Sequence, residues 1–159
     1  MEPKIVKLGP LCLAGQPYYG NPEGGAFGKA WERFDTKHNP VPGRVDPKIY
    51  YGLQVYGSEF MTEHKWTYMP AVQVHELSDL PGLLFGKILP ACTYAVFTAR
   101  NGLASIGETF MQGYNSWIPN SIYEVAYPFD FELYDDDRFH GDGPNEEIDV
   151  YIPIKEKTR

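Results

Sequence analysis

The 159-residue sequence has few features that nucleic-acid, metal or cofactor chemistry requires. Lys and Arg number 14 against 21 Asp and Glu, for a formal net charge of −7, and no basic cluster could follow a phosphate backbone. The four histidines show no HExxH motif or paired ligand spacing, and the glycines of NPEGGAFGKAW match neither a Walker motif nor GxGxxG. The sequence therefore predicts no direct nucleic-acid partner, no metal site and no cofactor.

Long apolar runs and cysteines are also scarce. Nowhere do 18 apolar residues run together, and Met1 leads into EPKIVKLGP rather than into a basic region with a long apolar stretch. We therefore expect no membrane segment, no signal peptide and a cytoplasmic location. Cys12 and Cys92 lie far apart with no CxxC motif, which favours buried reduced thiols over a disulfide.

Aromatic residues, in contrast, are abundant. The chain has 12 Tyr, 9 Phe and 3 Trp, and 43% of its residues are hydrophobic, a composition typical of a folded globule. Its length is sufficient for one domain with its own hydrophobic core. We therefore expect a single domain over residues 1–159.

Two stretches have the apolar spacing of an amphipathic helix. In residues 24–38 the apolar positions i, i+3, i+4 and i+7 are Phe27, Ala30, Trp31 and Phe34. In residues 103–119 the positions i, i+4, i+8 and i+11 are Ile106, Phe110, Tyr114 and Trp117, and Pro119 limits further continuation. The sequence predicts one short helix in each stretch.

Alternating apolar and polar residues predict a pair of strands after each helix. The first pair is residues 50–57 and 70–77, and the second is residues 129–135 and 147–155. One further extended stretch lies ahead of each helix, at residues 5–18 and 86–100. The predicted order is therefore strand, helix, strand, strand, and it occurs twice.

The two halves of the chain align with each other. AFGKAWERF overlays SIGETFMQG at an offset of 79, LQVY overlays FELY at 78, and Cys12 overlays Cys92 at 80. Offsets that nearly agree across separate elements indicate an internal duplication. We predict an α+β fold of two βαββ halves, about 4–78 and 85–155, with pseudo-twofold symmetry, antiparallel sheets, one helix per half and a cleft at the seam.

The second half also carries motifs of a known family. Trp117 to Glu124 reads W-x-P-x-S-x-Y-E, and it is followed by FELYDDDRF and the closing EIDVYIPIK. These motifs resemble the GyrI-like small-molecule-binding family, the effector-binding domain of AraC-type and multidrug-responsive regulators. The resemblance covers nearly the whole chain. It implies a duplicated βαββ fold and an aromatic cleft in which a glutamate meets flat, hydrophobic cations such as dyes and drugs.

Two glutamates are candidates for this ligand-facing acid. The resemblance selects Glu124, and Trp117, Tyr123 and Tyr127 could provide a low-dielectric wall around it. The alternative is a loop glutamate at the rim. Glu132 lies on the polar side of its strand, and the repeat aligns it with Gln54, so these two side chains could line the cleft floor; a solvated strand face is the alternative.

The other candidate ligand contacts are aromatic. From the helices and the segment that follows the second helix they are Phe27, Trp31, Phe110, Tyr114, Trp117 and Tyr123. From the strands they are Tyr51 and Tyr151, with Tyr56, Tyr68 and Tyr134 as the remaining pool. Tyrosine offers a flat face and a hydroxyl, which suits a cleft for varied aromatic ligands. Core packing is the alternative for the helix residues.

Three functions remain open from the sequence. The main hypothesis is a stand-alone binding protein that takes up hydrophobic, cationic, drug-like or dye-like aromatic compounds. The second is a hydrolase of reactive cyclopropane-bearing toxins, in which Glu124 would be catalytic and would orient or deprotonate a water molecule. The third is an interaction protein that modulates gyrase or a separate regulator. Turnover separates the first two, because a binder returns its ligand unchanged.

Overall fold

The computed structural model describes residues 1–141 and 143–158. The strands in chain order are β1 (Lys4–Leu8), β2 (Leu11–Gly15), β3 (Tyr18–Gly20), β4 (Ile49–Val55), β5 (Trp66–Gln73), β6 (Phe85–Leu89), β7 (Cys92–Ala99), β8 (Tyr123–Val125), β9 (Phe129–Asp135) and β10 (Ile148–Glu156). The helices are α1 (Ala26–Arg33), α2 (Glu59–Glu63) and α3 (Ile106–Gln112). Short 3-10 turns precede α1 and α3, and one π-helical turn, Gly113–Trp117, continues α3.

All strand pairs are antiparallel and belong to one sheet, in the order β1-β7-β10-β9-β4-β5-β2-β6. The short strands β3 and β8 pair with β5 and β10. At the centre β4 lies against β9, with Gly52 opposite Glu132 and Gln54 opposite Asp130. Each half of the chain therefore contributes one strand to the middle of the sheet.

The outer strands form a bent ribbon that closes one face of the sheet. β1 pairs with β7 and β2 pairs with β6 in the same register, and the pairing is interrupted around Pro10 and Pro90. Proline cannot donate a ladder hydrogen bond, so the ribbon can bend there. Side chains of the ribbon such as Leu13, Leu89 and Tyr94 pack in one core cluster with side chains of β4 and β9.

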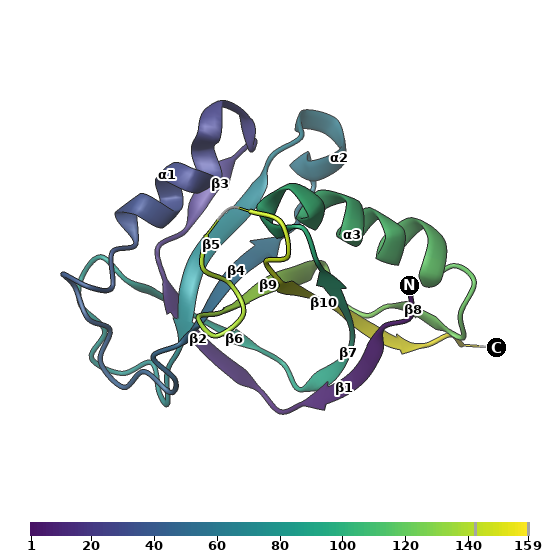
Figure 1. Ribbon diagram of the computed structural model, residues 1–159. Helices are drawn as coiled ribbons and strands as arrows, with labels where there is room; N and C mark the ends of the chain where they lie inside the picture. The colour runs from purple at the N-terminus through teal and green to yellow at the C-terminus, as the bar shows by residue number, and fades with distance from the viewer. Residues whose placement is uncertain (142, 159) are drawn as a thin grey trace.

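The period-2 alternation of β4 and β9 sends apolar and polar side chains to opposite faces. Leu53, Phe129 and Phe131 pack in the core under the ribbon. The alternate residues, among them Gln54 and Glu132, point to the other side, where α1 and α3 lie (Figure 1). The polar face of the central strands is therefore covered by helices instead of by water.

The predicted fold class is confirmed: the chain is α+β. The order strand, helix, strand, strand is found in β2, α1, β4, β5 and again in β7, α3, β9, β10, with shorter elements between them. The repeat boundaries at about 4–78 and 85–155 remain a proposal with which this order agrees. Cys12 and Cys92 are both free. Among the described residues no helix is both long and apolar enough to cross a membrane.

Several element boundaries differ from the prediction. The helix expected within residues 24–38 ends at Arg33, because Phe34 leaves the helical region. The strand expected at residues 70–77 starts four residues earlier, at Trp66. Its side chains are mostly buried on both faces, so it lacks alternation, and Pro70 lies inside it. The short elements α2, β3 and β8 have no periodic pattern in the sequence and were not predicted.

Candidate functional site

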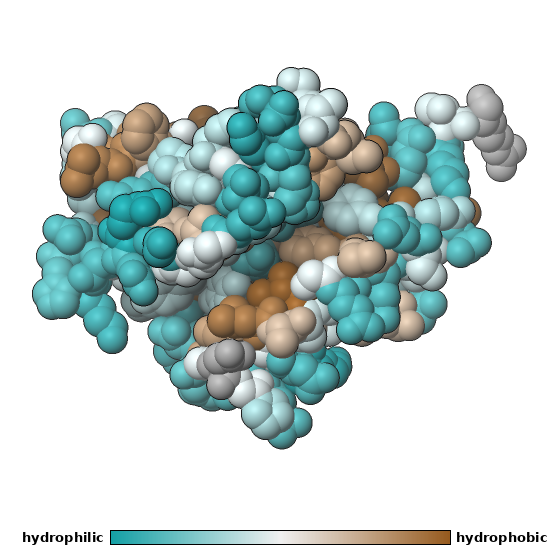
Figure 2. All heavy atoms as spheres, turned by 90° about the horizontal axis from the view of Figure 1, so that it is seen from above, coloured by the Kyte–Doolittle hydropathy of each residue, from teal (hydrophilic) through white to brown (hydrophobic). Residues whose placement is uncertain are grey.

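A cleft lies between α1 and α3, above β4, β5 and β9. It consists of two adjoining chambers of about 420 and 600 Å³, which share Gln54, Trp66, Gly107 and Phe110. We call the smaller one, to which Phe27, Trp31 and Tyr68 also belong, the Glu132 chamber. The larger one, with Tyr56, Phe60 and Tyr114, is the Asp130 chamber. Figure 2 looks down on the helix side and shows apolar groups near the middle of this face, bordered by hydrophilic ones.

Glu132 is a buried acid on the floor of its chamber. It is only 5% exposed, and its Oε1 accepts hydrogen bonds from the hydroxyls of Tyr68 (2.8 Å) and Tyr134 (2.7 Å). Trp31 Nε1 donates to the Tyr68 hydroxyl at 2.8 Å, which fixes that ring. Burial raises the pKa of Glu132 to about 7, and the two tyrosine hydrogen bonds partly oppose the rise.

The second carboxylate oxygen of Glu132 is available to a ligand. Among the described residues no hydrogen-bond donor reaches Oε2, and no Lys, Arg or His forms an ion pair with this carboxylate. The surrounding chamber walls are mainly aromatic and aliphatic. A carboxylate in such surroundings is expensive to keep charged unless a cation compensates it.

Asp130 is a second buried acid, two residues earlier on the same face of β9. It is completely buried and accepts hydrogen bonds from Gln54 Nε2 (2.9 Å), the Tyr56 hydroxyl (2.9 Å) and the Tyr114 hydroxyl (2.7 Å). Trp66 Nε1 donates to Gln54 Oε1 at 2.9 Å and orients that amide. Burial raises the pKa of Asp130 to about 7, and its hydrogen bonds oppose the rise.

Aromatic rings supply most of the cleft walls. Phe27 of α1 stacks on Tyr68, with ring centroids 4.0 Å apart and planes at 8°. In the Asp130 chamber Phe60 packs edge-on against Trp66 at 5.3 Å and lies 4.6 Å from Tyr56. Flat faces of this kind bind aromatic ligands by stacking and bind cations through the ring quadrupole.

Six of the candidate ligand contacts named from the sequence lie together in this cleft. They are Phe27, Trp31, Gln54, Phe110, Tyr114 and Glu132. In particular, Gln54 and Glu132 line the same chamber. Tyr127, expected in the wall around Glu124, lines the larger chamber as well. Tyr56, Tyr68 and Tyr134, from the wider pool of strand tyrosines, bring their hydroxyls to the two acids.

Glu124 lies elsewhere. It belongs to β8, where it is opposite Lys155 of β10, and the two side chains form an ion pair at 3.6 Å. Its side chain is 42% exposed and lines neither chamber. The expected aromatic wall around Glu124 is therefore absent from the described residues, because along β8 only the neighbouring Tyr123 packs inward.

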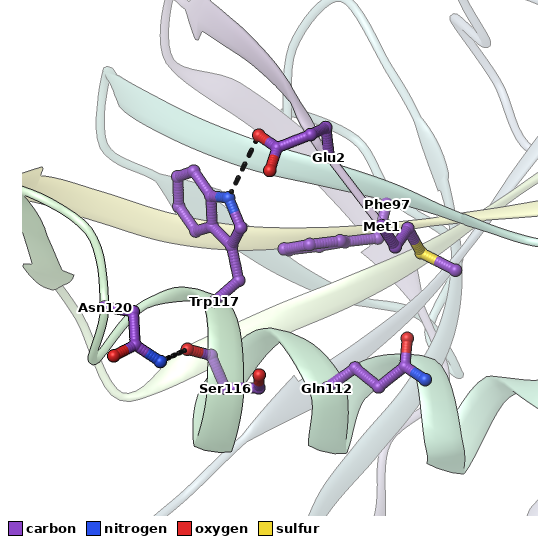
Figure 3. A pocket seen from close by; sticks show the side chains of 7 residues that line it. All are labelled: Met1, Glu2, Phe97, Gln112, Ser116, Trp117 and Asn120. Atoms are coloured by element: carbon purple, nitrogen blue, oxygen red, sulfur yellow. Dashed lines mark hydrogen bonds between the residues drawn. The ribbon is translucent and has the colours of Figure 1, made fainter.

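Trp117 and Tyr123 form a separate aromatic pair. Their rings stack with centroids 5.9 Å apart, and both pack on the apolar cluster beneath the far end of α3. Figure 3 shows Trp117 beside Phe97 and Glu2, whose carboxylate accepts a hydrogen bond from Trp117 Nε1 at 3.4 Å. Trp117 lines a different hollow, of about 460 Å³, instead of the cleft, and Tyr123 lines neither.

Tyr51 and Tyr151 face the opposite side of the sheet. Tyr151 stacks on Phe131 at 4.6 Å, and Tyr51 packs edge-on against the same ring at 5.4 Å. Both contribute to the core under the bent ribbon. Alternation along β4 explains the position of Tyr51, because the residues on either side of Gly52 point away from the helices.

Phe60 and Trp66, which line the cleft, and Asp130, which lies directly behind its wall, were not predicted from the sequence. Asp130 had a usable signal, since it is two residues from Glu132 and a strand places such residues on one face. Trp66 was missed because the predicted strand began too late. Phe60 lies in α2, a single-turn helix without a periodic pattern.

Comparisons with known proteins agree with this architecture. The model of the GyrI-like small molecule binding domain matches residues 1–155. The transcriptional regulator BrlR of Pseudomonas aeruginosa is 32% identical over 157 residues, which is 97% of this chain and 56% of BrlR. The chain thus spans about half the length of this relative.

Two solved structures have a similar fold. The structure of SAV2435 bound to tetraphenylphosphonium has a TM-score of 0.69 at 18% identity, and covers 98% of this chain and 94% of that one. The C-terminal domain of EcmrR has a TM-score of 0.74 at 12% identity, with 98% of each chain covered. The match over nearly the full length confirms the resemblance seen in the sequence: the chain belongs to the GyrI-like small-molecule-binding family.

Proposed function

We propose that this protein binds hydrophobic, cationic aromatic compounds in the cleft between α1 and α3, with Glu132 as the counter-charge. The proposal rests on the burial and the hydrogen bonds of Glu132. Its carboxylate is buried among aromatic rings, Oε1 accepts both tyrosine hydrogen bonds, and Oε2 has no donor among the described residues. A cation that enters would meet a charge strengthened by the low dielectric of the chamber.

The chamber walls favour broad selectivity. Stacking on Phe27, Trp31 and Phe110 depends on ring area and tolerates many ring systems, whereas only a few polar groups line the chamber. The formal net charge of −7 would also attract cations to the molecule. The named ligand of SAV2435, tetraphenylphosphonium, is a hydrophobic cation, which agrees with this class of compound.

The test compares Glu132→Gln with Glu124→Gln, an exposed acid outside the cleft. Each variant and the wild type are titrated by calorimetry with tetraphenylphosphonium and with triphenylphosphine oxide, a neutral analogue. We expect Glu132→Gln to lose about tenfold or more of its affinity for the cation and to keep its affinity for the neutral compound. Glu124→Gln should leave both affinities unchanged. An equal loss of affinity for the two ligands in Glu132→Gln would contradict the proposal. A loss of affinity in Glu124→Gln alone would also contradict it.

A second candidate function is hydrolysis of a strained electrophile. The pKa of about 7 would let Glu132 accept a proton from a water molecule near neutral pH, and the hydroxyls of Tyr68 and Tyr134 lie beside it. The water oxygen would bond to a ring carbon of a cyclopropane, one ring C–C bond would break, and the other carbon would take up a proton. Mass spectrometry of a recovered cyclopropane-bearing compound tests this. A product heavier by one water that Glu132→Gln fails to form would favour the enzyme, and unchanged compound would favour the binder.

A further inference from the structure

Two buried acids border the cleft: Glu132 lines the smaller chamber, and Asp130 lies directly behind Gln54, Tyr56 and Tyr114 in the wall of the larger one. Asp130 and Glu132 leave the same face of β9 two residues apart, a separation along the strand of roughly 7 Å. The two chambers adjoin through Gln54, Trp66, Gly107 and Phe110. Given the proposed function, on which this step depends, we propose that the cleft is built for dications: aromatic compounds with two positive centres, one beside Glu132 and the other in the Asp130 chamber.

The Asp130 chamber has the features of a cation-binding aromatic box. Tyr56, Phe60, Trp66 and Tyr114 contribute rings around a space of about 600 Å³. The hydroxyls of Tyr56 and Tyr114 both donate to Asp130 Oδ2, so a carboxylate lies directly behind two of these rings. A phenol that donates to a carboxylate becomes richer in electrons, which strengthens the attraction of its face for a cation.

Neither acid has a positive partner within residues 1–141 and 143–158. Among the described residues the ion pairs involve neither Asp130 nor Glu132, and all donors to the two carboxylates are neutral. A fully buried carboxylate is strongly unfavourable when a cation does not compensate its charge. The two oxygens of Asp130 are both acceptors, for Gln54 on one side and for the two tyrosine hydroxyls on the other. These neutral donors satisfy the hydrogen bonds of the carboxylate but leave its negative charge without a counter-charge.

The two acids also act on each other. The charge of Glu132 raises the pKa of Asp130, so the empty cleft disfavours holding both charges at once. A ligand with one positive centre compensates the charge of one carboxylate. A ligand with two positive centres compensates both carboxylates and so removes the repulsion between them. The geometry thus favours a dication over a monocation of the same shape.

The experiment compares two ligands of one shape that differ in charge. Benzyl viologen carries two cationic nitrogens at opposite ends of a flat biaryl unit, a separation close to that of two positions along a strand. 1-Benzyl-4-(4-benzylphenyl)pyridinium keeps both benzyl groups and the biaryl unit but has carbon in place of one of these nitrogens. Calorimetric titration of the wild type at pH 8 should give an affinity for benzyl viologen that is about tenfold or more higher than for the monocation.

Two variants assign this preference to the two acids. Asp130→Asn should remove most of the preference for benzyl viologen and change the affinity for the monocation by less than about threefold. Glu132→Gln should lower the affinity for both ligands by about tenfold. Equal affinities of the wild type for the two ligands would overturn the inference. An equal loss of affinity for the two ligands in Asp130→Asn would also overturn the inference, because Asp130 would then only shape the cleft.

Tyr114→Phe keeps the inference testable if Asp130→Asn does not fold. It retains the ring and the acid but removes one hydroxyl donor to Asp130, and we expect the dication preference to fall by a few fold. Tyr51→Phe is the matched control, because Tyr51 is a buried strand tyrosine on the opposite face of the sheet. An unchanged preference in Tyr114→Phe would count against the inference.

The outcomes also separate this inference from the proposed function. In one outcome, the wild type binds the monocation through Glu132 and shows no preference for the dication. That result would leave the proposed function intact and overturn the inference that the cleft binds dications. If the wild type binds neither compound, both fail together.

Discussion

Gly52 and Glu132 lie opposite each other across the β4–β9 pair, and a methyl group on Gly52 would come within 2.4 Å of Glu132 Oε1 and 2.6 Å of the Tyr68 hydroxyl. The backbone of β4 therefore forms the wall against which the carboxylate and its tyrosine donor pack. The absence of a side chain at position 52 is what leaves room for the buried acid.

Gly52→Ala should displace Glu132 and weaken cation binding. Alanine is compatible with the extended backbone here, so the effect would come from the contact and not from backbone strain. We expect a loss of affinity for tetraphenylphosphonium of about tenfold, as for removal of a close charge, measured by calorimetry. Gly57→Ala is the control, because a methyl group there meets no atom within 4 Å. Unchanged affinity in Gly52→Ala would show that Glu132 holds its place by other contacts.

Cation affinity should rise with pH up to about 7 and then level off. Only the ionised form of Glu132 pairs with a cation, and burial raises its pKa to about 7. Below that pH the affinity should fall by about tenfold per unit, because the ligand must displace a proton. Titrations of tetraphenylphosphonium between pH 5 and pH 9 test this. The affinity of Glu132→Gln should not change with pH. An affinity of the wild type that does not change with pH would mean that Glu132 is not the counter-charge.

Glu132 should lower the stability of the folded protein at neutral pH. The pKa of a glutamate in the unfolded chain is near 4.5, whereas that of folded Glu132 is about 7. Between these values the folded state keeps a proton that the unfolded state has released, so the contribution of Glu132 to the free energy of unfolding falls as pH rises and is constant above about 7.

Glu132→Gln should therefore stabilise the protein above pH 7 while it abolishes cation selectivity. The gain in the free energy of unfolding, on the order of 3 kcal/mol at most, follows from the difference between the two pKa values. Urea unfolding of both proteins at pH 5 and pH 8 measures it. A variant that is less stable than the wild type at pH 8 would indicate that Glu132 is chiefly structural.

Tyr134→Phe should move the pH midpoint of cation binding upward. The Tyr134 hydroxyl donates to Glu132 at 2.7 Å and lowers the pKa of that carboxyl, so its loss lets burial raise the pKa further. Tyr51→Phe, on the other face of the sheet, should leave the midpoint in place. The readout is the same set of titrations across pH. A midpoint that stays constant in Tyr134→Phe would contradict the assignment of Glu132 as the titrating group.

Local patterns in the sequence were sufficient to predict the fold class. The alternation in residues 129–135 matches β9 residue for residue, and the apolar spacing around Phe27 and Phe110 identified the two main helices. Both signals are periodic, and the period alone assigns each side chain to a face. The internal repeat aligned Gln54 with Glu132, and both side chains line the same chamber.

Which acid enters the cleft was decided by tertiary structure. Glu124 and Glu132 both lie among aromatic residues in the sequence, but β8 pairs with the C-terminal end of β10, whereas β9 pairs with β4 at the centre of the sheet. Glu124 therefore meets Lys155 and solvent, and Glu132 meets tyrosine hydroxyls from β5 and its own strand. The sequence by itself determined which residues share a strand face. Burial, and with it the raised pKa, depends on which strands become neighbours, and that is a property of long-range pairing that no local period encodes.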